Sequence, residues 1–85
     1  MKLRVKRLAE HLTELYGSSV GENITLLVND NPLNGYAVEV LKLETKYQVV
    51  FYHRAKIFDV ISWEHKRSVS TAVKYINAVL DKRSA

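Results

Sequence analysis

The chain has 85 residues, of which 47% are apolar and 26% are charged. This length holds one small domain and excludes a two-domain enzyme, and the apolar content with only three Gly and one Pro excludes a disordered chain. Because the sequence contains no Cys, disulfides, thiol catalysis and cysteine-ligated metal centres are excluded as well. We therefore expect a single domain over residues 1–85.

The charge balance is moderately basic, with 13 Lys and Arg against 9 Asp and Glu and a net charge of +4. This balance favours a polyanionic partner such as nucleic acid, although it also serves simple solubility. No run approaches the roughly 20 consecutive apolar residues of a membrane span, and charges throughout residues 1–17 argue against a signal peptide. The sequence thus predicts a cytoplasmic protein with no membrane partner.

The first predicted element is a helix over Leu3–Tyr16. Its apolar residues recur at steps of three and four and form a single stripe, which consists of Val5, Leu8, Leu12 and Leu15. Gly17 follows this stripe and is expected to end the helix in the left-handed conformation.

Three or four strands are predicted next. The first is Ile24–Asn29, and the dense turn signal of residues 30–35 separates it from a second strand over Tyr36–Glu44. A third strand, Tyr47–His53, follows a two-residue connection. Lys56–Trp63 is either a fourth strand or the second half of one long bent strand. Because each connection is too short for a parallel crossover, we expect an antiparallel meander.

The last predicted element is a helix over Val69–Arg83, with Ser68 or else Ser70 as its N-cap. The predicted fold class is therefore α+β, with an N-terminal helix, an antiparallel meander of three or four strands and a C-terminal helix. Apolar residues occur on both faces of the predicted strands. Either the helices cover both faces of the sheet, or one face meets a partner, for which a second copy of the chain is the simplest choice.

Two basic clusters are the most specific feature of the sequence. One opens the last helix, where free N–H groups and the helix dipole favour an anion, and comprises Lys66, Arg67, Ser68 and Lys74. The other lies at the N-terminus and comprises Lys2, Arg4, Lys6 and Arg7. If both clusters share one face, Arg54 and Lys56 extend them into a positive stripe that contacts several phosphates. Solvated helix and loop ends are the alternative interpretation.

The aromatic residues of the strand region predict a contact surface. We expect Phe51 and Phe58 in the core, and Tyr36, Tyr52 and Trp63 exposed on the sheet. Exposed aromatic rings stack on unpaired bases, and they are equally typical of protein interfaces. These residues therefore do not distinguish a nucleic acid from a protein partner.

Catalysis has no positive support in the sequence. The three histidines, His11, His53 and His65, lack the spacing of metal ligands, and no phosphate-binding glycine loop or nucleophile motif occurs. A small ribonuclease needs only acid–base groups and cations, so His53 or His65 beside their basic neighbours leaves a nuclease or toxin as the third hypothesis. We expect no enzyme activity, no cofactor and no metal.

The order of helix, three-stranded meander and helix resembles the double-stranded RNA-binding domain. In that family a basic cluster at the start of the last helix binds phosphates across a groove, and residues 65–74 occupy the corresponding place here. The family has a Pro-His pair between its first two strands, whereas this chain has Pro32 followed by Leu33. The resemblance is therefore one of architecture, which does not determine function.

These features together predict a small, non-catalytic accessory or regulatory protein that binds nucleic acid through its basic clusters. The alternative is a protein-interaction module, such as a dimeric adaptor or inhibitor, that uses the apolar second face of the sheet.

Overall fold

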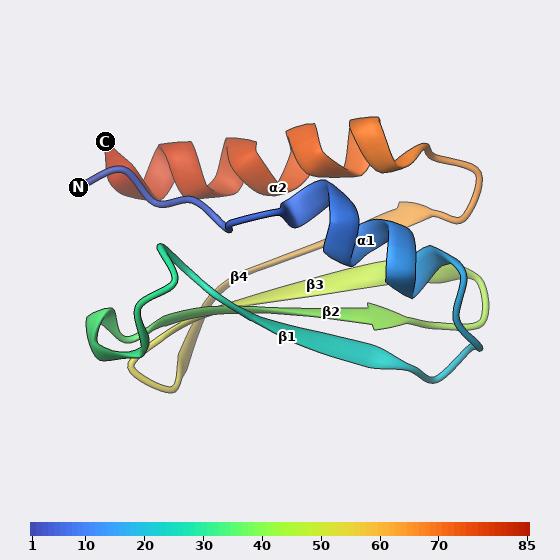
Figure 1. The fold of residues 1–85 in the computed structure, drawn as a ribbon, viewed down its shortest axis with the longest axis horizontal. Helices are drawn as coiled ribbons and strands as arrows, with labels where there is room; N and C mark the ends of the chain where they lie inside the picture. The colour runs from blue at the N-terminus through green and yellow to red at the C-terminus, as the bar shows by residue number, and fades with distance from the viewer.

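The protein is described by a computed structural model of residues 1–85. Two helices and a four-stranded sheet form the predicted α+β fold in the predicted order (Figure 1). The elements are α1 (Leu8–Tyr16), β1 (Asn23–Leu27), the 3-10 turn η1 (Pro32–Asn34), β2 (Tyr36–Lys42), β3 (Lys46–His53), β4 (Lys56–Glu64) and α2 (Val69–Ser84). The predicted N-cap of the last helix is correct, because the Ser68 side chain accepts a hydrogen bond from the Thr71 N–H.

The sheet is a meander in which β1, β2, β3 and β4 lie side by side in chain order, all antiparallel. A separate fourth strand is therefore correct, and the alternative of one long bent strand is wrong. The reason is the tight turn between β3 and β4, where Arg54 and Ala55 both have positive φ, at 52° and 66°. Two such residues in succession are typical of the two-residue hairpin turn that matches strand twist.

The first helix begins later than its apolar spacing predicts. Residues before Leu8 are not helical, and Arg7 has a left-handed φ of 56° at the helix start. Leu3 and Val5 are buried from an extended segment, in which Val5 forms an isolated antiparallel bridge with Val28. Leu3 and Val5 lie two residues apart, which suits one face of a strand, whereas Leu8 fits only the spacing of a helix. Burial of Leu3 and Val5 beside the strand region selected the extended conformation for these two residues.

The helix ends differently as well. Gly17 has φ −82°, so it closes α1 in the right-handed region and not in the expected left-handed one. The carbonyls at this end receive a tertiary partner, because the Lys42 ammonium donates hydrogen bonds to the Tyr16 and Ser18 carbonyls at 2.7 and 2.6 Å. A cation is the favourable charge at a helix C-terminus, and here the sheet supplies it.

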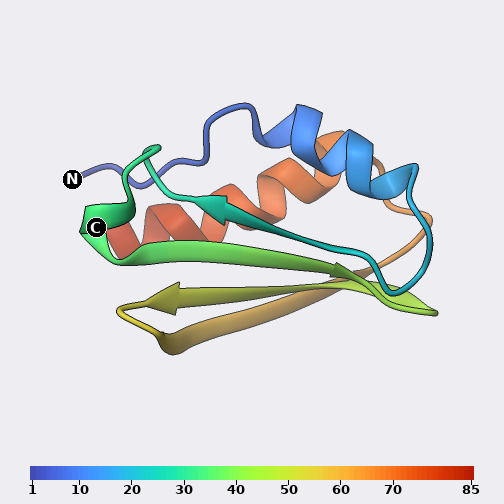
Figure 2. The same cartoon turned by 60° about the horizontal axis from the view of Figure 1, so that its bottom comes forward.

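Both helices pack on the same face of the sheet (Figure 2). A single cluster of 16 buried residues fills the space between the helices and the sheet and is centred on Phe51, Val38 and Val49. The expectation that helices cover both faces is therefore wrong. The mixed apolar pattern of β3 instead reflects Val49 and Phe51 on the covered inner face, with Val50 and Tyr52 on the uncovered outer face.

Candidate functional site

The two predicted basic clusters lie at opposite ends of the molecule. The N-terminal segment runs beside the last turn of α2, where the Leu3 N–H donates to Ser84 Oγ at 2.9 Å. Lys66 and Arg67 instead precede the first turn of α2. A helix of 16 residues separates the two groups, which amounts to about 24 Å. The structure therefore does not bring them together into the single positive stripe that we expected.

Half of the predicted phosphate-binding residues already have an acidic partner. Arg4 contacts Asp81 at 2.7 Å, and its hydrogen bond lowers the pKa of that carboxyl below its ordinary value. The other ion pairs are Lys6 with Asp30, Arg7 with Glu10, and both Lys66 and Arg67 with Glu64. These exposed pairs contribute little to stability, but each carboxylate reduces the positive potential that a phosphate would meet.

The start of α2 offers less to a phosphate than the sequence predicts. Ser68 accepts the Thr71 N–H at 3.1 Å and also donates to the Thr71 hydroxyl, so its side chain serves the helix itself. Lys74 has no ion-pair partner, but it follows a full turn later on an exposed part of the helix. The residues at this end therefore form no cluster of unpaired charges.

The β3–β4 turn and the last turn of α2 lie at the other end of the molecule (Figures 1 and 2), and both carry cations that form no ion pair. We call this group the basic end, and it comprises Lys2, Arg54, Lys56, Lys82 and Arg83. None of the five forms an ion pair. The first three are among the phosphate ligands predicted from the sequence, whereas Lys82 and Arg83 are not, because a basic last turn is also the ordinary complement to a helix dipole.

Arg83 is the most constrained member of the basic end. Its guanidinium carbon lies 4.6 Å from the centre of the Phe58 ring, and its Nε donates to the Tyr36 hydroxyl at 3.4 Å. Tyr36 in turn stacks on His53, with ring centres 4.0 Å apart. An arginine held by two aromatic rings loses less side-chain freedom when it binds an anion, so Arg83 is the side chain of the group best suited to that role.

Two of the three aromatic residues expected on the open face of the sheet lie on the helix-covered face. Trp63 is 5% exposed, and its indole N–H donates to the Tyr16 hydroxyl at 2.8 Å. Tyr36 lies under the last turn of α2 beside Arg83. The expectation failed because strand alternation places Trp63 opposite buried Tyr47. Tyr52 alone lies on the outer face, where its hydroxyl donates to Glu39.

The outer face carries a small apolar surface in which Tyr52 is the one aromatic residue. Ile57, Val60 and Leu27 are 58%, 46% and 43% exposed. Strand pairing places Leu27, Ala37, Tyr52 and Ile57 in one row across all four strands. This row lies at the same end of the sheet as the β3–β4 turn.

The histidines are distributed without a shared site. His53 ends β3, whereas His65 follows β4 and has its Nε2 2.8 Å from the Leu43 carbonyl. The nine residues of β4 separate them, which corresponds to about 30 Å of strand. No three His or carboxylate side chains come close enough to hold a metal ion.

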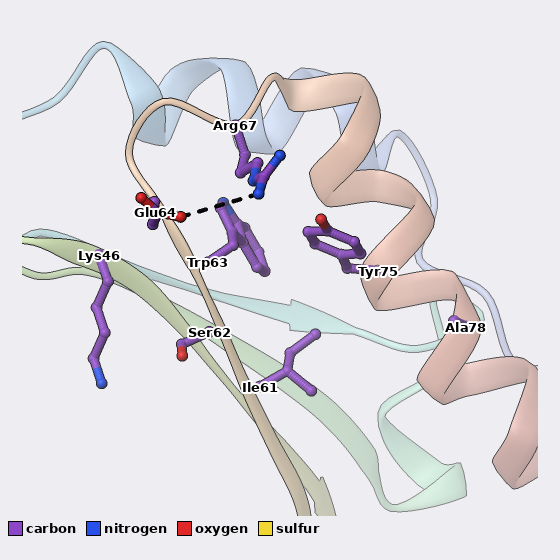
Figure 3. A pocket seen from close by; sticks show the side chains of 8 residues that line it. All are labelled: Lys46, Ile61, Ser62, Trp63, Glu64, Arg67, Tyr75 and Ala78. Carbon is purple, nitrogen blue, oxygen red and sulfur yellow. Dashed lines mark ion pairs between the residues drawn. The ribbon is translucent and has the colours of Figure 1, made fainter.

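A hollow between β4 and α2 was not singled out by the sequence (Figure 3). Its volume is about 520 Å³, and its lining residues are Lys46, Ile61, Ser62, Trp63, Glu64, Arg67, Tyr75 and Ala78. The lining combines apolar and aromatic surface with charges of both signs, which is typical of a binding groove. Only the packing of α2 beside β4 creates it.

Neither helix has the length and apolar composition needed to cross a lipid bilayer. Searches of protein-family models, curated protein sequences and solved structures found no match to this chain.

Proposed function

We propose that the protein is a non-catalytic nucleic-acid-binding module whose phosphate contacts are made by the basic end. The observation that carries this proposal is the grouping of charge: all five cations of the basic end lack an ion pair, whereas elsewhere only Lys42, Lys46 and Lys74 do. The N-terminus, the β3–β4 turn and α2 present them together at one end of a compact molecule. Phosphates of a nucleic-acid backbone are the polyanion that such an arrangement fits.

The contacts would be electrostatic and independent of sequence. Lys2, Lys56 and Lys82 are flexible point charges, whereas Arg83 is held by its aromatic neighbours. Binding through backbone phosphates, without reading of base edges, is the mode that follows.

A charge-reversal pair tests this proposal. We expect Arg54→Glu with Lys56→Glu to weaken binding to labelled DNA and RNA by about tenfold or more in fluorescence anisotropy at low salt. For the unaltered protein, log affinity should fall with log salt with a slope of about −4 to −5, which corresponds to one phosphate contact for each cation of the basic end on a duplex. The matched control is Lys66→Glu with Arg67→Glu, which changes the net charge equally at the opposite end.

The control determines how a loss of binding is interpreted. Equal losses in both double variants would show that net charge alone drives association, and a larger loss in the control would move the site to the start of α2. Absence of binding at low salt would refute the nucleic-acid proposal, since even non-specific electrostatic binding is strongest there.

The second candidate function is a protein-interaction module that self-associates through its outer sheet face. The row of outer-face residues that ends in Ile57, together with Val60, favours self-association. Small monomeric proteins rarely leave adjacent apolar side chains uncovered. We expect sedimentation to show a concentration-dependent dimer that Ile57→Lys abolishes. Leu33→Lys, at a position 93% exposed outside the sheet, is the control. A monomer at all concentrations would refute this candidate.

A further inference from the structure

The sheet has two edge strands, β1 and β4, and β4 is the longer of the two. On the β1 side the N-terminal segment covers the end of the strand region, where Val5 bridges to Val28 and the Asn29 N–H donates to the Arg4 carbonyl at 2.6 Å. No strand pairs with the outer side of β4, which is nine residues long. An edge strand of this length presents backbone donors and acceptors to any extended chain that lies beside it.

Hydrogen bonds at both ends of β3 establish which residues of β4 face outward. The Leu43 N–H donates to the Lys46 carbonyl, and the Arg54 N–H donates to the Gly35 carbonyl. Lys46 and Arg54 therefore direct their backbone groups toward β2, as do the other even-numbered residues of β3. The odd-numbered residues of β3 bond to β4.

The pairing of β3 with β4 extends this alternation to the edge. Ile61 lies opposite an odd-numbered residue of β3, so the N–H and C=O of Val60, Ser62 and Glu64 point away from the sheet. The Val60 N–H supports this placement, because it donates to Oδ1 of the adjacent Asp59 at 2.8 Å and to no other strand. One edge donor is thus occupied by the chain's own carboxylate, in the position that a carbonyl of an added strand would take.

The helix α2 runs beside this edge and turns it into a groove. Figure 3 shows Trp63 and Ile61 of β4 on one side of the hollow and Tyr75 and Ala78 of α2 on the other. A smaller hollow of about 230 Å³ lies farther along the same seam and is lined by Phe58, Asp59, Val79, Lys82 and Arg83. Alternate side chains of an added strand would therefore meet apolar surface along the seam.

The charges along the groove select the partner. Cations lie at both of its ends, Lys46 and Arg67 beside the first hollow and Lys82 and Arg83 beside the second. The two carboxylates of the lining are already engaged, Glu64 by Lys66 and Arg67 and Asp59 by the backbone of β4. The excess of positive charge complements a negatively charged segment and would repel the same groove of a second copy of this chain.

We propose that the groove between β4 and α2 binds an extended, acidic segment of a protein partner, which pairs with the free edge of β4 as a fifth strand. The segment carries apolar residues at alternate positions, directed toward Trp63 and Ile61, and acidic residues at both ends. A protein segment fits better than a nucleic acid, because only a peptide backbone matches the alternating N–H and C=O groups of Val60 and Ser62. This inference does not depend on nucleic-acid binding at the basic end.

The experiment uses the peptide acetyl-Asp-Glu-Val-Thr-Val-Glu-Asp-amide as the probe. Its sequence reads the same in both directions, so it fits β4 in either strand orientation. Titration into the ¹⁵N-labelled protein should shift the amide signals of Val60, Ser62 and Glu64 most strongly. Two control peptides, one with Lys at every acidic position and one with Pro in place of Thr, should leave these signals unchanged, because they lack the charge or the strand geometry.

Two variants distinguish the groove from general attraction between a basic protein and an acidic peptide. Ala78→Trp fills the groove from the exposed side of α2 without altering charge, and we expect it to weaken peptide binding by about tenfold. Ala9→Trp makes the same change on exposed α1 and should have no effect. Asp59→Asn removes a carboxylate from the edge and should tighten binding by about threefold, since one exposed charge contributes about that much.

The outcomes separate the proposal from its competitors. Shifts confined to the β3–β4 turn, or equal binding by the Ala78→Trp and Ala9→Trp variants, would overturn the groove as the site. Displacement of the peptide by an eight-residue uridine oligonucleotide that shifts the same edge amides would assign the groove to nucleic acid. Absence of any shift with the acidic peptide would refute strand addition, and the anisotropy measurements on the basic end would be unaffected by that result.

Discussion

Replacement of Phe51 by Ala is expected to destabilise the protein most of all single core substitutions. Phe51 is fully buried at the centre of the sheet, between β2 and β4 and under both helices. Loss of a buried phenyl ring costs about 3–5 kcal/mol of the free energy of unfolding, because the cavity cannot close completely. Domains of this kind are stable by only about 5–15 kcal/mol, and small ones lie at the low end. Urea denaturation followed by circular dichroism measures the change.

Phe58→Ala is the matched control, because it removes the same ring from a partly exposed position. Phe58 packs against Phe51, with the two rings tilted by 48°, and its face lies under Arg83. We expect a loss of only about 1–2 kcal/mol, since most of that ring's surface is not in the core. A loss in Phe58→Ala as large as that in Phe51→Ala would show that the core does not centre on β3.

Substitution of Lys42 by Met is expected to lower the free energy of unfolding almost as much as a core substitution, although Lys42 is a charged residue. Its ammonium donates to the Tyr16 and Ser18 carbonyls just after α1, at 2.7 and 2.6 Å. Met has a similar length and no donor, so the variant leaves two partly buried carbonyls without these partners. A loss of about 2–3 kcal/mol follows from the strength of charge-assisted hydrogen bonds and the cost of unpaired acceptors.

Lys46→Met separates this effect from a general change in charge. Lys46 is exposed at the start of β3 and forms no ion pair, so its replacement should alter the free energy of unfolding by less than about 0.5 kcal/mol. Thermal unfolding of both variants, with hydrogen exchange of the α1 amides, checks the expectation. Equal stability of the two variants would show that Lys42 does not anchor the end of α1.

The sequence by itself determined the elements whose local signals agree with their burial. The turn signal of residues 30–35, the serine before α2 and the short connections between strands all predict what the structure contains. A period-two pattern or a capping hydroxyl acts through neighbours in the chain, so it can be recognised without knowledge of the fold. These signals predict an antiparallel meander between two helices, and the structure decided between three and four strands.

Tertiary structure decided where the first helix begins and which aromatic residues are covered. Leu3 and Val5 fit a strand or a helix, and only their burial beside β1 selects the extended form. Trp63 and Tyr52 carry equal strand signals, but the helices pack on the face that holds Trp63. The alternation of residues along a strand indicates only that the two faces of the sheet differ. The energy of packing determines which face the helices cover.

The candidate sites were decided almost entirely by tertiary structure. The sequence identified most of the cations, whereas the ion pair of Arg4 depends on Asp81 and that of Lys6 on Asp30, both distant along the chain. Lys2, Lys56 and Lys82 come from three separate segments that meet only after folding. The edge of β4 became a groove because α2 packs beside it. Electrostatic potential and concave surface depend on distances through space, and these distances are absent from the order of residues.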